Sequence, residues 1–334
     1  MMRWSISPAA RQRLARWFMP MTALIGVTLL GYAIAQIGVE RVLETLATLG
    51  PILPVVLAIT AFKYPLQAAA WRLALKPEMR PGWRVSVAAT LSGDALGYLT
   101  WAGPFTGEPI KAYLTRDHVP VALGVTAGAV ERALYNATAA IIVIIAAALV
   151  LPTHESRLWL AAGLVAASGG LVAWWRARSS RVRAAQASST ATTGKTRGVV
   201  AELVRDLWWA RPAALVGMLV LEAAQHALLM LEAYVMLATL GARPDLRTVA
   251  IFEGLTKVVN TVGMIVPGRL GIAEGGSAFL ADALGLGASY GMGLAIMRRV
   301  RAIAWGSVGL LLMPQRERKA RKAMTRSTRP LAPR

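Results

Sequence analysis

Long apolar segments constrain the fold of this chain more than any other feature. Six of them approach or exceed the roughly 20 residues that an α-helix needs to cross a bilayer. They lie at residues 17–37, 52–75, 119–151, 158–175, 213–240 and 290–313. Over all 334 residues, 56% are hydrophobic and only 16% are charged. The sequence therefore predicts an all-α, polytopic helical bundle in the bacterial inner membrane, with about six full spans.

Two polar motifs interrupt this pattern, at residues 103–116 (GPFTGEPIKAYLTR) and 266–276 (VPGRLGIAEGG). The first ends the apolar segment 85–103, and the second separates the apolar segments 249–266 and 270–286. Broken helices with charged side chains are tolerated at membrane depth only where they pack inside protein or line a cavity. We therefore expect two re-entrant or broken-helix hairpins. Because Pro104 and Pro267 lie 163 residues apart, about half the chain, we also expect an inverted repeat.

The basic residues predict the topology. The formal charge of +20 is concentrated at residues 3–16, 72–84, 176–211 and 316–334, beside the apolar segments. The positive-inside rule places these stretches and both termini in the cytoplasm, with the connections 38–51 and 152–157 outside. It also explains the basic charge without nucleic acid, which we exclude as a partner. The first segment is expected to be an uncleaved span, since its apolar run is longer than that of a signal peptide.

The stretch at residues 179–211 begins with a small, polar and basic sequence, which predicts a flexible cytoplasmic linker. It separates a first membrane half, residues 1–178, from a second, residues 212–314. Residues 315–334 form a basic cytoplasmic tail, expected to be disordered or to lie on the anionic leaflet. Neither segment is long enough for a soluble domain, so we expect any function to reside in the membrane.

No metal site or cofactor is expected. The chain has no cysteine, and its three histidines fall in different segments. The glycine-rich second motif matches neither of the common nucleotide-binding patterns, and no strand precedes it.

The first motif contains two candidates for substrate binding, Glu108 and Lys111. Their i, i+3 spacing puts them on one helical face, where they can pair. Either they are an interfacial cap and a snorkelling lysine, or they border a cavity for a lipid headgroup. In the second case Pro104 and Gly107 would open the backbone and expose amide donors to phosphate oxygens.

Glu131 and Arg132 lie deep within the segment 119–151, where an unpaired charge is costly. Either they neutralise partners on neighbouring helices, or Arg132 binds phosphate, with Asn136 on the same face at i+4. Glu131 is then a candidate for coupling transport to protons or ions.

A polar stripe that includes Glu253 and Lys257 runs along the apolar segment 249–266. The stripe is typical of an amphipathic surface helix, but it leads directly into Pro267 and Gly268. We therefore interpret Lys257 as a cavity-facing binding residue and Glu253 as a coupling candidate.

The second motif and the last span supply the remaining binding candidates, Arg269, Glu274, Arg298 and Arg299. Gly268 and Gly271 would permit close backbone approach and a positive φ. Guanidinium groups suit phosphate, although arginines at a span end also anchor helices at the interface. Because these arginines lie on the side where positive charge is disfavoured, a ligand or a buried acid such as Glu274 is expected nearby.

Asp94 and His226 complete the coupling candidates. His226 shares a helical face with Glu222 and Gln225, so interhelical hydrogen bonds are the simpler interpretation. A proton relay is the alternative, because histidine titrates near physiological pH.

These motifs carry a family resemblance. GEPIKAYLTR with the following helix, and VPGRLGIAEGGSAFLADALGL with the last helix, resemble the lysylphosphatidylglycerol synthase transmembrane-region family of flippase-like membrane proteins. The run Glu274-Gly275-Gly276 and the arginines at 298, 299 and 301 are similar to a branch associated with hopanoid biosynthesis. The resemblance implies an integral membrane protein that moves lipids. The chain lacks the soluble synthase domain of the best-understood member, so the resemblance implies no synthase activity and leaves the substrate open.

We therefore expect a non-enzymatic, flippase-like protein. It would translocate an anionic or modified phospholipid, or a hopanoid-related amphiphile, through a polar cavity between the two motifs. Membrane lipids are the expected partners, with lipid-synthesis enzymes or a second copy in a homodimer as further candidates. The alternatives are an accessory protein of lipid or hopanoid biosynthesis and, with less support, a membrane enzyme that uses a lipid-linked substrate.

Overall fold

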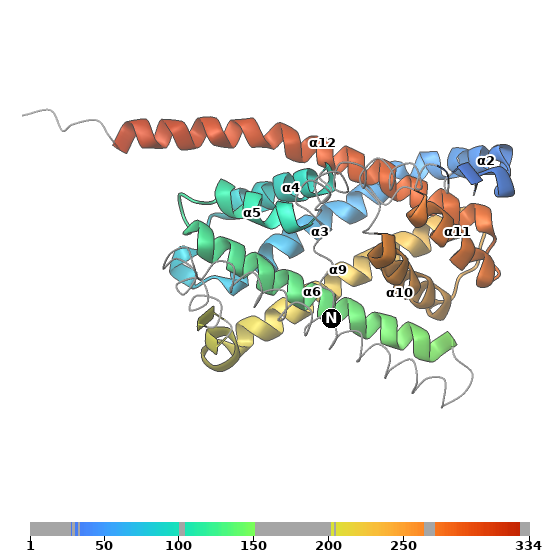
Figure 1. Ribbon diagram of the computed structural model, residues 1–334, viewed down its shortest axis with the longest axis horizontal. Helices are drawn as coiled ribbons and strands as arrows, with labels where there is room; N and C mark the ends of the chain where they lie inside the picture. Colours follow the sequence, from blue (N-terminus) through green and yellow to red (C-terminus); the bar gives the residue numbers. More distant parts are fainter. Residues whose placement is uncertain are drawn as a thin grey trace, which may run out of the picture.

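The computed structural model describes residues 28, 31–32, 34–99, 104–150, 202–203, 205–263 and 271–327. Within these ranges every regular element is a helix, as the apolar pattern predicts (Figure 1). The described part of the chain is thus all-helical, as expected of a polytopic helical membrane protein.

In the described part of the first half, the structure gives the bounds of five α-helices. They are α2 (Val39–Leu49), α3 (Leu53–Ala74), α4 (Trp83–Leu99), α5 (Pro104–Leu114) and α6 (Val121–Val150). Short 3-10 turns at Gly50–Ile52 and Pro77–Met79 precede α3 and α4, respectively. The second half begins with a π-helical turn at Asp206–Ala210. It continues with α9 (Pro212–Thr239), α10 (Leu246–Val262), α11 (Ile272–Ala283) and α12 (Ala288–Ser327).

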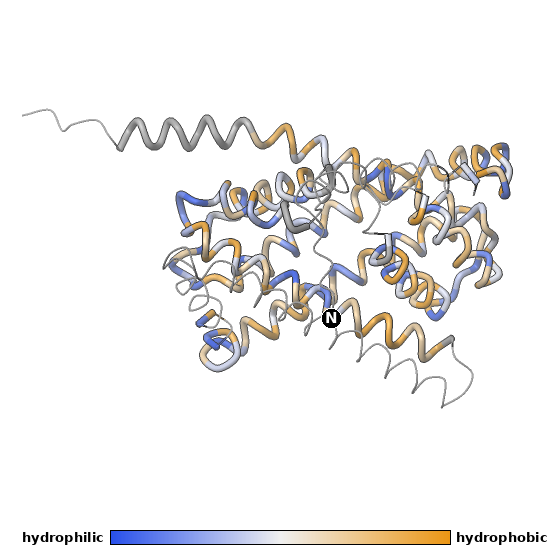
Figure 2. The backbone as a smooth tube through the Cα atoms, in the orientation of Figure 1, coloured by the Kyte–Doolittle hydropathy of each residue, from blue (hydrophilic) through white to orange (hydrophobic). Residues whose placement is uncertain are grey.

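Three described helical segments are long and apolar enough to cross a membrane: Val39–Ala74, Val121–Leu149 and Pro212–Thr239. Apolar stretches run along α6 and α9 in Figure 2. By contrast, α4 and α10 have 17 residues each. At about 1.5 Å per residue they are roughly 25 Å long, which is short of a hydrocarbon core of about 30 Å.

The same order of elements occurs twice. A long helix is followed by a short helix, a break, a second short helix and another long helix, in α3 to α6 and again in α9 to α12. The packing is reciprocal: α4 lies along α12 of the other half, α10 lies along α6, and α3 packs against α9 (Figure 1). Each short pair also contacts the long helix that follows it. This exchange of contacts relates the two halves as a structural repeat.

Apolar packing fixes the second short pair against the long helices. The largest buried cluster contains Val56 of α3, Met236 of α9, Phe252 of α10, Leu280 of α11 and Leu294 of α12. Because this cluster joins helices of both halves, it fixes the positions of those helices and of the polar side chains that they carry.

Three segments expected to be a connection, a tail or a linker contain helical structure. The expected connection 38–51 forms α2, since Val42, Leu46 and Leu49 recur at helical spacing and pack inward. The helix α12 continues into the predicted tail as far as Ser327. Part of the predicted linker is also ordered, because residues 206–211 pack against the end of α3. The segment 158–175 and most of 17–37 lie outside the described residues.

Candidate functional site

The first motif builds a buried ion-pair network between α5 and α6. Lys111 Nζ lies 2.6 Å from Glu108 Oε2 and 3.5 Å from Glu131 Oε2. Arg132 Nη2 lies 3.2 Å from Glu108 Oε1. Lys111 is only 2% exposed and Glu131 is fully buried. Thus Glu108 and Lys111 pair as their spacing predicts, and Glu131 and Arg132 are their partners on the next helix.

Helices α3 and α4 extend this network. Asp94 of α4 lies 3.9 Å from Arg132 Nη2 and 3.8 Å from Lys63 Nζ of α3. Gln67, one turn after Lys63, lies beside both Asp94 and Arg132. With its amide oriented to satisfy both neighbours, it donates to Asp94 Oδ2 and accepts from Arg132 Nη2, each at 3.2 Å. We call the charged residues Lys63, Asp94, Glu108, Lys111, Glu131 and Arg132 the first charge cluster.

Glycines let these helices approach closely enough for the charges to meet. A Cβ on Gly107 would lie 2.8 Å from the carbonyl oxygen of Gly93, so α5 and α4 touch through their backbones. A Cβ on Gly128 would collide with the carboxylate of Glu108. The expectation that Gly107 opens the backbone is therefore wrong, since this residue lies inside α5 and serves close packing. Pro104 is the first residue of α5, a position that tolerates its missing N–H.

The second half contains a corresponding network between α9, α10 and α12. Arg298 Nη2 lies 2.7 Å from Glu253 Oε2, and Arg298 Nε lies 3.7 Å from Glu232 Oε1. Arg301 pairs with the other oxygen of Glu232, and Lys257 Nζ lies 3.4 Å from Glu253 Oε1. Both carboxylates are buried. We call Glu232, Glu253, Lys257, Arg298 and Arg301 the second charge cluster.

Glu274 and Arg299 form a further pair beside the second break. Arg299 Nε donates to Glu274 Oε1 at 2.7 Å, so Glu274 has the arginine partner that the sequence predicts. The other oxygen of Glu274 accepts from the amide of Gly271 at 2.9 Å and caps α11. Gly271 has a φ of 74°, a left-handed conformation that favours glycine. Pro267, Gly268 and Arg269 lie outside the described residues.

His226 joins the two halves. Its Nε2 lies 3.2 Å from the carbonyl oxygen of Tyr135 and 3.1 Å from Thr138 Oγ1, both on α6. Its Nδ1 lies 3.1 Å from Lys257 Nζ on α10. The ring also packs on that of Tyr135, with centroids 4.4 Å apart. His226 is therefore a polar junction between α6, α9 and α10.

Each half has a polar side-chain contact at the equivalent position of the repeat. His226 follows Lys63 by 163 residues, and Lys257 follows Asp94 by the same 163 residues. Each pair links the first long helix of its half to the first short helix, as Lys63–Asp94 and as His226–Lys257. Pro104 and Pro267 obey the same offset. The repeat therefore extends to the polar positions, although the residue types have diverged.

The clusters differ in charge. The first holds three cations and three carboxylates, whereas the second holds three cations and two carboxylates. Several buried polar atoms of this region have no hydrogen-bond partner among the described residues, among them Glu131 Oε1, Arg132 Nε and Glu222 Oε1. Buried polar atoms are normally satisfied by protein, water or ligand. These atoms are therefore positions where water or a polar ligand group would complete the hydrogen bonding.

One predicted site residue, Asn136, differs from its neighbours in exposure, and several residues of the charge clusters lay outside the predictions. Asn136 is exposed, unlike the half-buried Arg132 and Tyr135. Four residues after Arg132 the helix has turned about 40° beyond a full turn, which moves Asn136 away from the inward face. Lys63 and Gln67 were not identified, although a lone lysine inside an apolar span is a recognisable signal. Glu232, on the same helix as His226, proves to be a shared carboxylate of the second charge cluster.

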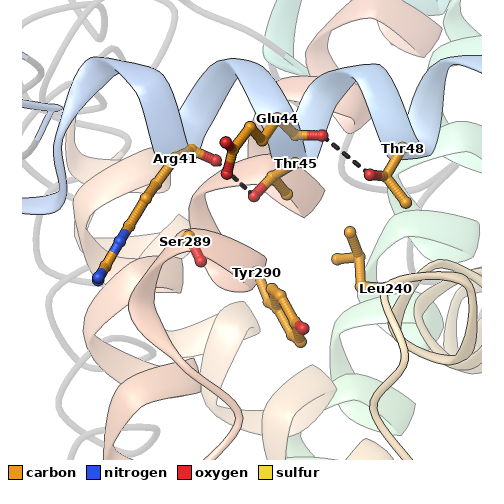
Figure 3. Close-up of a pocket in the computed structure, with 7 residues that line it drawn as sticks. All are labelled: Arg41, Glu44, Thr45, Thr48, Leu240, Ser289 and Tyr290. Carbon is orange, nitrogen blue, oxygen red and sulfur yellow. Dashed lines mark hydrogen bonds between the residues drawn. The ribbon is translucent and has the colours of Figure 1, made fainter.

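A separate polar pocket of about 330 Å³ lies between α2, the end of α9 and the start of α12 (Figure 3). It is lined by Arg41, Glu44, Thr45, Thr48, Leu240, Ser289 and Tyr290. The hydroxyls of Thr45 and Thr48 donate to backbone carbonyls of their own helix. Since no lining residue belongs to either charge cluster, we assign the pocket no part in the site.

Comparison with known proteins agrees with this architecture. No curated protein and no solved structure matched the chain. A family model described as the lysylphosphatidylglycerol synthase TM region matches residues 21–309, which include both charge clusters. The chain therefore belongs to the lysylphosphatidylglycerol synthase transmembrane-region family, and it is a membrane protein of the lipid metabolism and transport kind.

Proposed function

We propose that this chain is a flippase-like protein that translocates a lipid across the cytoplasmic membrane. The observation that carries this proposal is the pair of buried charge clusters, one in each half, beside the two broken-helix pairs. A single charge at the bilayer centre costs about 3 kcal/mol or more unless it is paired or reaches water. Well-packed apolar residues could replace buried ion pairs at little cost in stability, so their presence favours a polar pathway.

The headgroup would pass between the halves while the acyl or other apolar part remains in the lipid. Arg298 and Lys257 offer charge-assisted donors that suit a phosphodiester. The unpartnered atoms of Glu131, Arg132 and Glu222 offer further contacts for polar headgroup atoms. The surplus cation of the second charge cluster favours an anionic lipid. Modified phospholipids and hopanoid-related amphiphiles remain the other members of the proposed substrate class.

We propose no chemical step for this chain. Each carboxylate of the two charge clusters lies within ion-pair distance of a lysine or arginine, so it is poorly placed to act as a general base. We also propose cytoplasmic termini and re-entrant short pairs. Because the chain has no cysteine, labelling of single introduced cysteines from each side of the membrane tests this topology directly.

Lipid exchange in proteoliposomes tests translocation. The purified chain is reconstituted with fluorescent headgroup-labelled phosphatidylglycerol, and an impermeant quencher reports which leaflet holds the probe. Glu108→Gln and Arg298→Gln should each slow exchange at least about tenfold, the effect of losing roughly 1.4 kcal/mol of stabilisation. Glu78→Gln and Arg243→Gln, at exposed positions, are the matched controls and should exchange lipid as the unaltered chain does.

The same assay distinguishes translocation from the two alternative functions. An accessory protein of lipid synthesis would move no lipid in this assay, and an enzyme would convert a lipid-linked substrate instead. Absence of protein-dependent exchange with phosphatidylglycerol and with other anionic lipids would refute translocation.

A further inference from the structure

The contacts of His226 determine which ring nitrogen carries its proton. A carbonyl oxygen can only accept, so the Nε2 that faces the Tyr135 carbonyl at 3.2 Å must be the N–H donor. In a neutral ring, Nδ1 is then an acceptor. The ammonium of Lys257 donates to it at 3.1 Å. With this assignment, a neutral imidazole accepts a hydrogen bond from a protonated lysine.

We propose that this His226–Lys257 pair is a proton-binding site that couples proton uptake to binding of an anionic headgroup. The inference rests on the proposed translocation, and it names proton uptake as the energy source of that translocation. A proton that binds to Nδ1 takes the position of the lysine hydrogen bond, so Lys257 must withdraw. Lys257 keeps its own proton, and the charge of the pair rises from +1 to +2.

The surroundings oppose this second charge unless an anion arrives with it. The charged and titratable groups that act on the pair from neighbouring helices are Lys63 of α3, Tyr135 of α6, Glu253 of α10 and Arg298 of α12. On α9 itself, Glu222 lies one turn before His226. Lys63, Glu253 and Arg298 are already held in ion pairs of the charge clusters. Of these groups, Glu253 is the ion-pair partner of Lys257, and Arg298 already shares that carboxylate. A phosphodiester that binds the displaced Lys257 would supply the missing negative charge.

The position of the pair gives proton uptake a structural consequence. The contact joins α9 to the short helix α10, and its counterpart Lys63–Asp94 joins α3 to α4. Breaking the contact removes one polar contact between α10 and α9 in the second half alone, because the first half holds a salt bridge at that register. Proton and headgroup would then bind together, and linkage requires that each increases the affinity for the other.

Calorimetry of short-chain phosphatidylglycerol binding to the full chain in detergent tests the coupling. Titration near pH 7 in two buffers of different ionisation enthalpy gives the number of protons taken up with each lipid. We expect a clear fraction of one proton for the unaltered chain and none for His226→Gln. The exposed His118 gives the matched control, since His118→Gln should take up as many protons as the unaltered chain.

Proteoliposome exchange with an imposed pH gradient, at zero membrane potential, supplies the second measurement. The gradient should accelerate exchange by the unaltered chain and by His118→Gln but not by His226→Gln. His226→Asn, which keeps an amide near Nδ1, repeats the test in case the glutamine variant misfolds. Lipid binding or exchange without proton uptake would overturn the coupling and leave translocation standing. Absence of both binding and exchange would overturn both proposals.

Discussion

Lys111 offers the sharpest test of the buried network, because one ammonium serves two carboxylates. At an effective dielectric constant of about 20, attractions at 2.6 Å and 3.5 Å amount to roughly 6 and 5 kcal/mol before desolvation is counted. Desolvation of the buried ions removes most of this gain. Replacement by methionine, which has a similar shape, would leave Glu108 with Arg132 but Glu131 without its closest cation. We therefore expect Lys111→Met to lower the free energy of unfolding by about 3–5 kcal/mol.

A double-mutant cycle distinguishes the loss of charge pairing from a simple packing defect. Glu131→Gln removes the charge that Lys111→Met leaves uncompensated. The double variant should therefore be more stable than Lys111→Met alone, with an interaction energy of about 1–3 kcal/mol. Equilibrium unfolding in mixed detergent micelles, followed by the fluorescence of the 11 tryptophans, measures each corner of the cycle.

The exposed Lys76 provides the matched control, and Lys76→Met should change stability by less than about 0.5 kcal/mol. A cost below about 1 kcal/mol for Lys111→Met would refute the reasoning, because it would mean that the carboxylates reach water. Strict additivity in the cycle would refute it as well.

Three further changes test how the helices are held. Gly107→Ala should lower the free energy of unfolding by about 1–3 kcal/mol, because its Cβ would lie 2.8 Å from the carbonyl oxygen of Gly93. A Cβ at Gly82 would meet open space, so Gly82→Ala is the control, and thermal unfolding compares the two variants. Arg211→Lys should lose about 1–3 kcal/mol in the same assay, because one ammonium cannot replace the guanidinium bonds to three carbonyls at the end of α3. The hydrogen bond from Thr248 lowers the pKa of Asp245 below its ordinary 3.8, so the cap stabilises α10 above that pH and is lost as the pH falls through the lower value. Asp245→Asn should remove this acid dependence while it keeps the cap, and amide hydrogen exchange at the start of α10 measures it.

The sequence could predict the helices and the pairs within a helix, since both depend on local spacing. Apolar length predicts α3, α6 and α9 closely, and the i, i+3 and i, i+4 spacings predict the Glu108–Lys111 and Glu253–Lys257 pairs. Partners on different helices depend on packing angles that no spacing encodes. The contacts of Lys63 with Asp94 and of Arg298 with Glu232 therefore required the structure.

The role of Gly107 also depends on packing that the sequence does not encode. A glycine beside a proline in an interrupted apolar pattern indicates either an opened backbone or a close helix contact. Gly107 proves to be the second, and only the opposing Gly93 decides between them. By contrast, the interpretation of Gly271 as a special backbone position is consistent with its positive φ, because the following Glu274 cap requires a turn at that point.

The two halves share one backbone plan, so differences in charge between their equivalent positions can be compared directly. Two halves with the same backbone plan would present similar sites to the two sides of the membrane, and a passive carrier would need nothing more. Here the shared register has diverged in charge: Lys63 and Asp94 neutralise each other, whereas His226 and Lys257 can hold a further proton. A salt bridge between lysine and aspartate responds little to pH between 5 and 8, whereas an imidazole can take up a proton there once an anion is bound beside it. If the proton site were instead a structural hydrogen bond, replacement of His226–Lys257 by the Lys–Asp pair of the first half should preserve all transport properties. If it couples protons to lipid, that exchange should leave lipid movement in place and remove its dependence on the pH gradient.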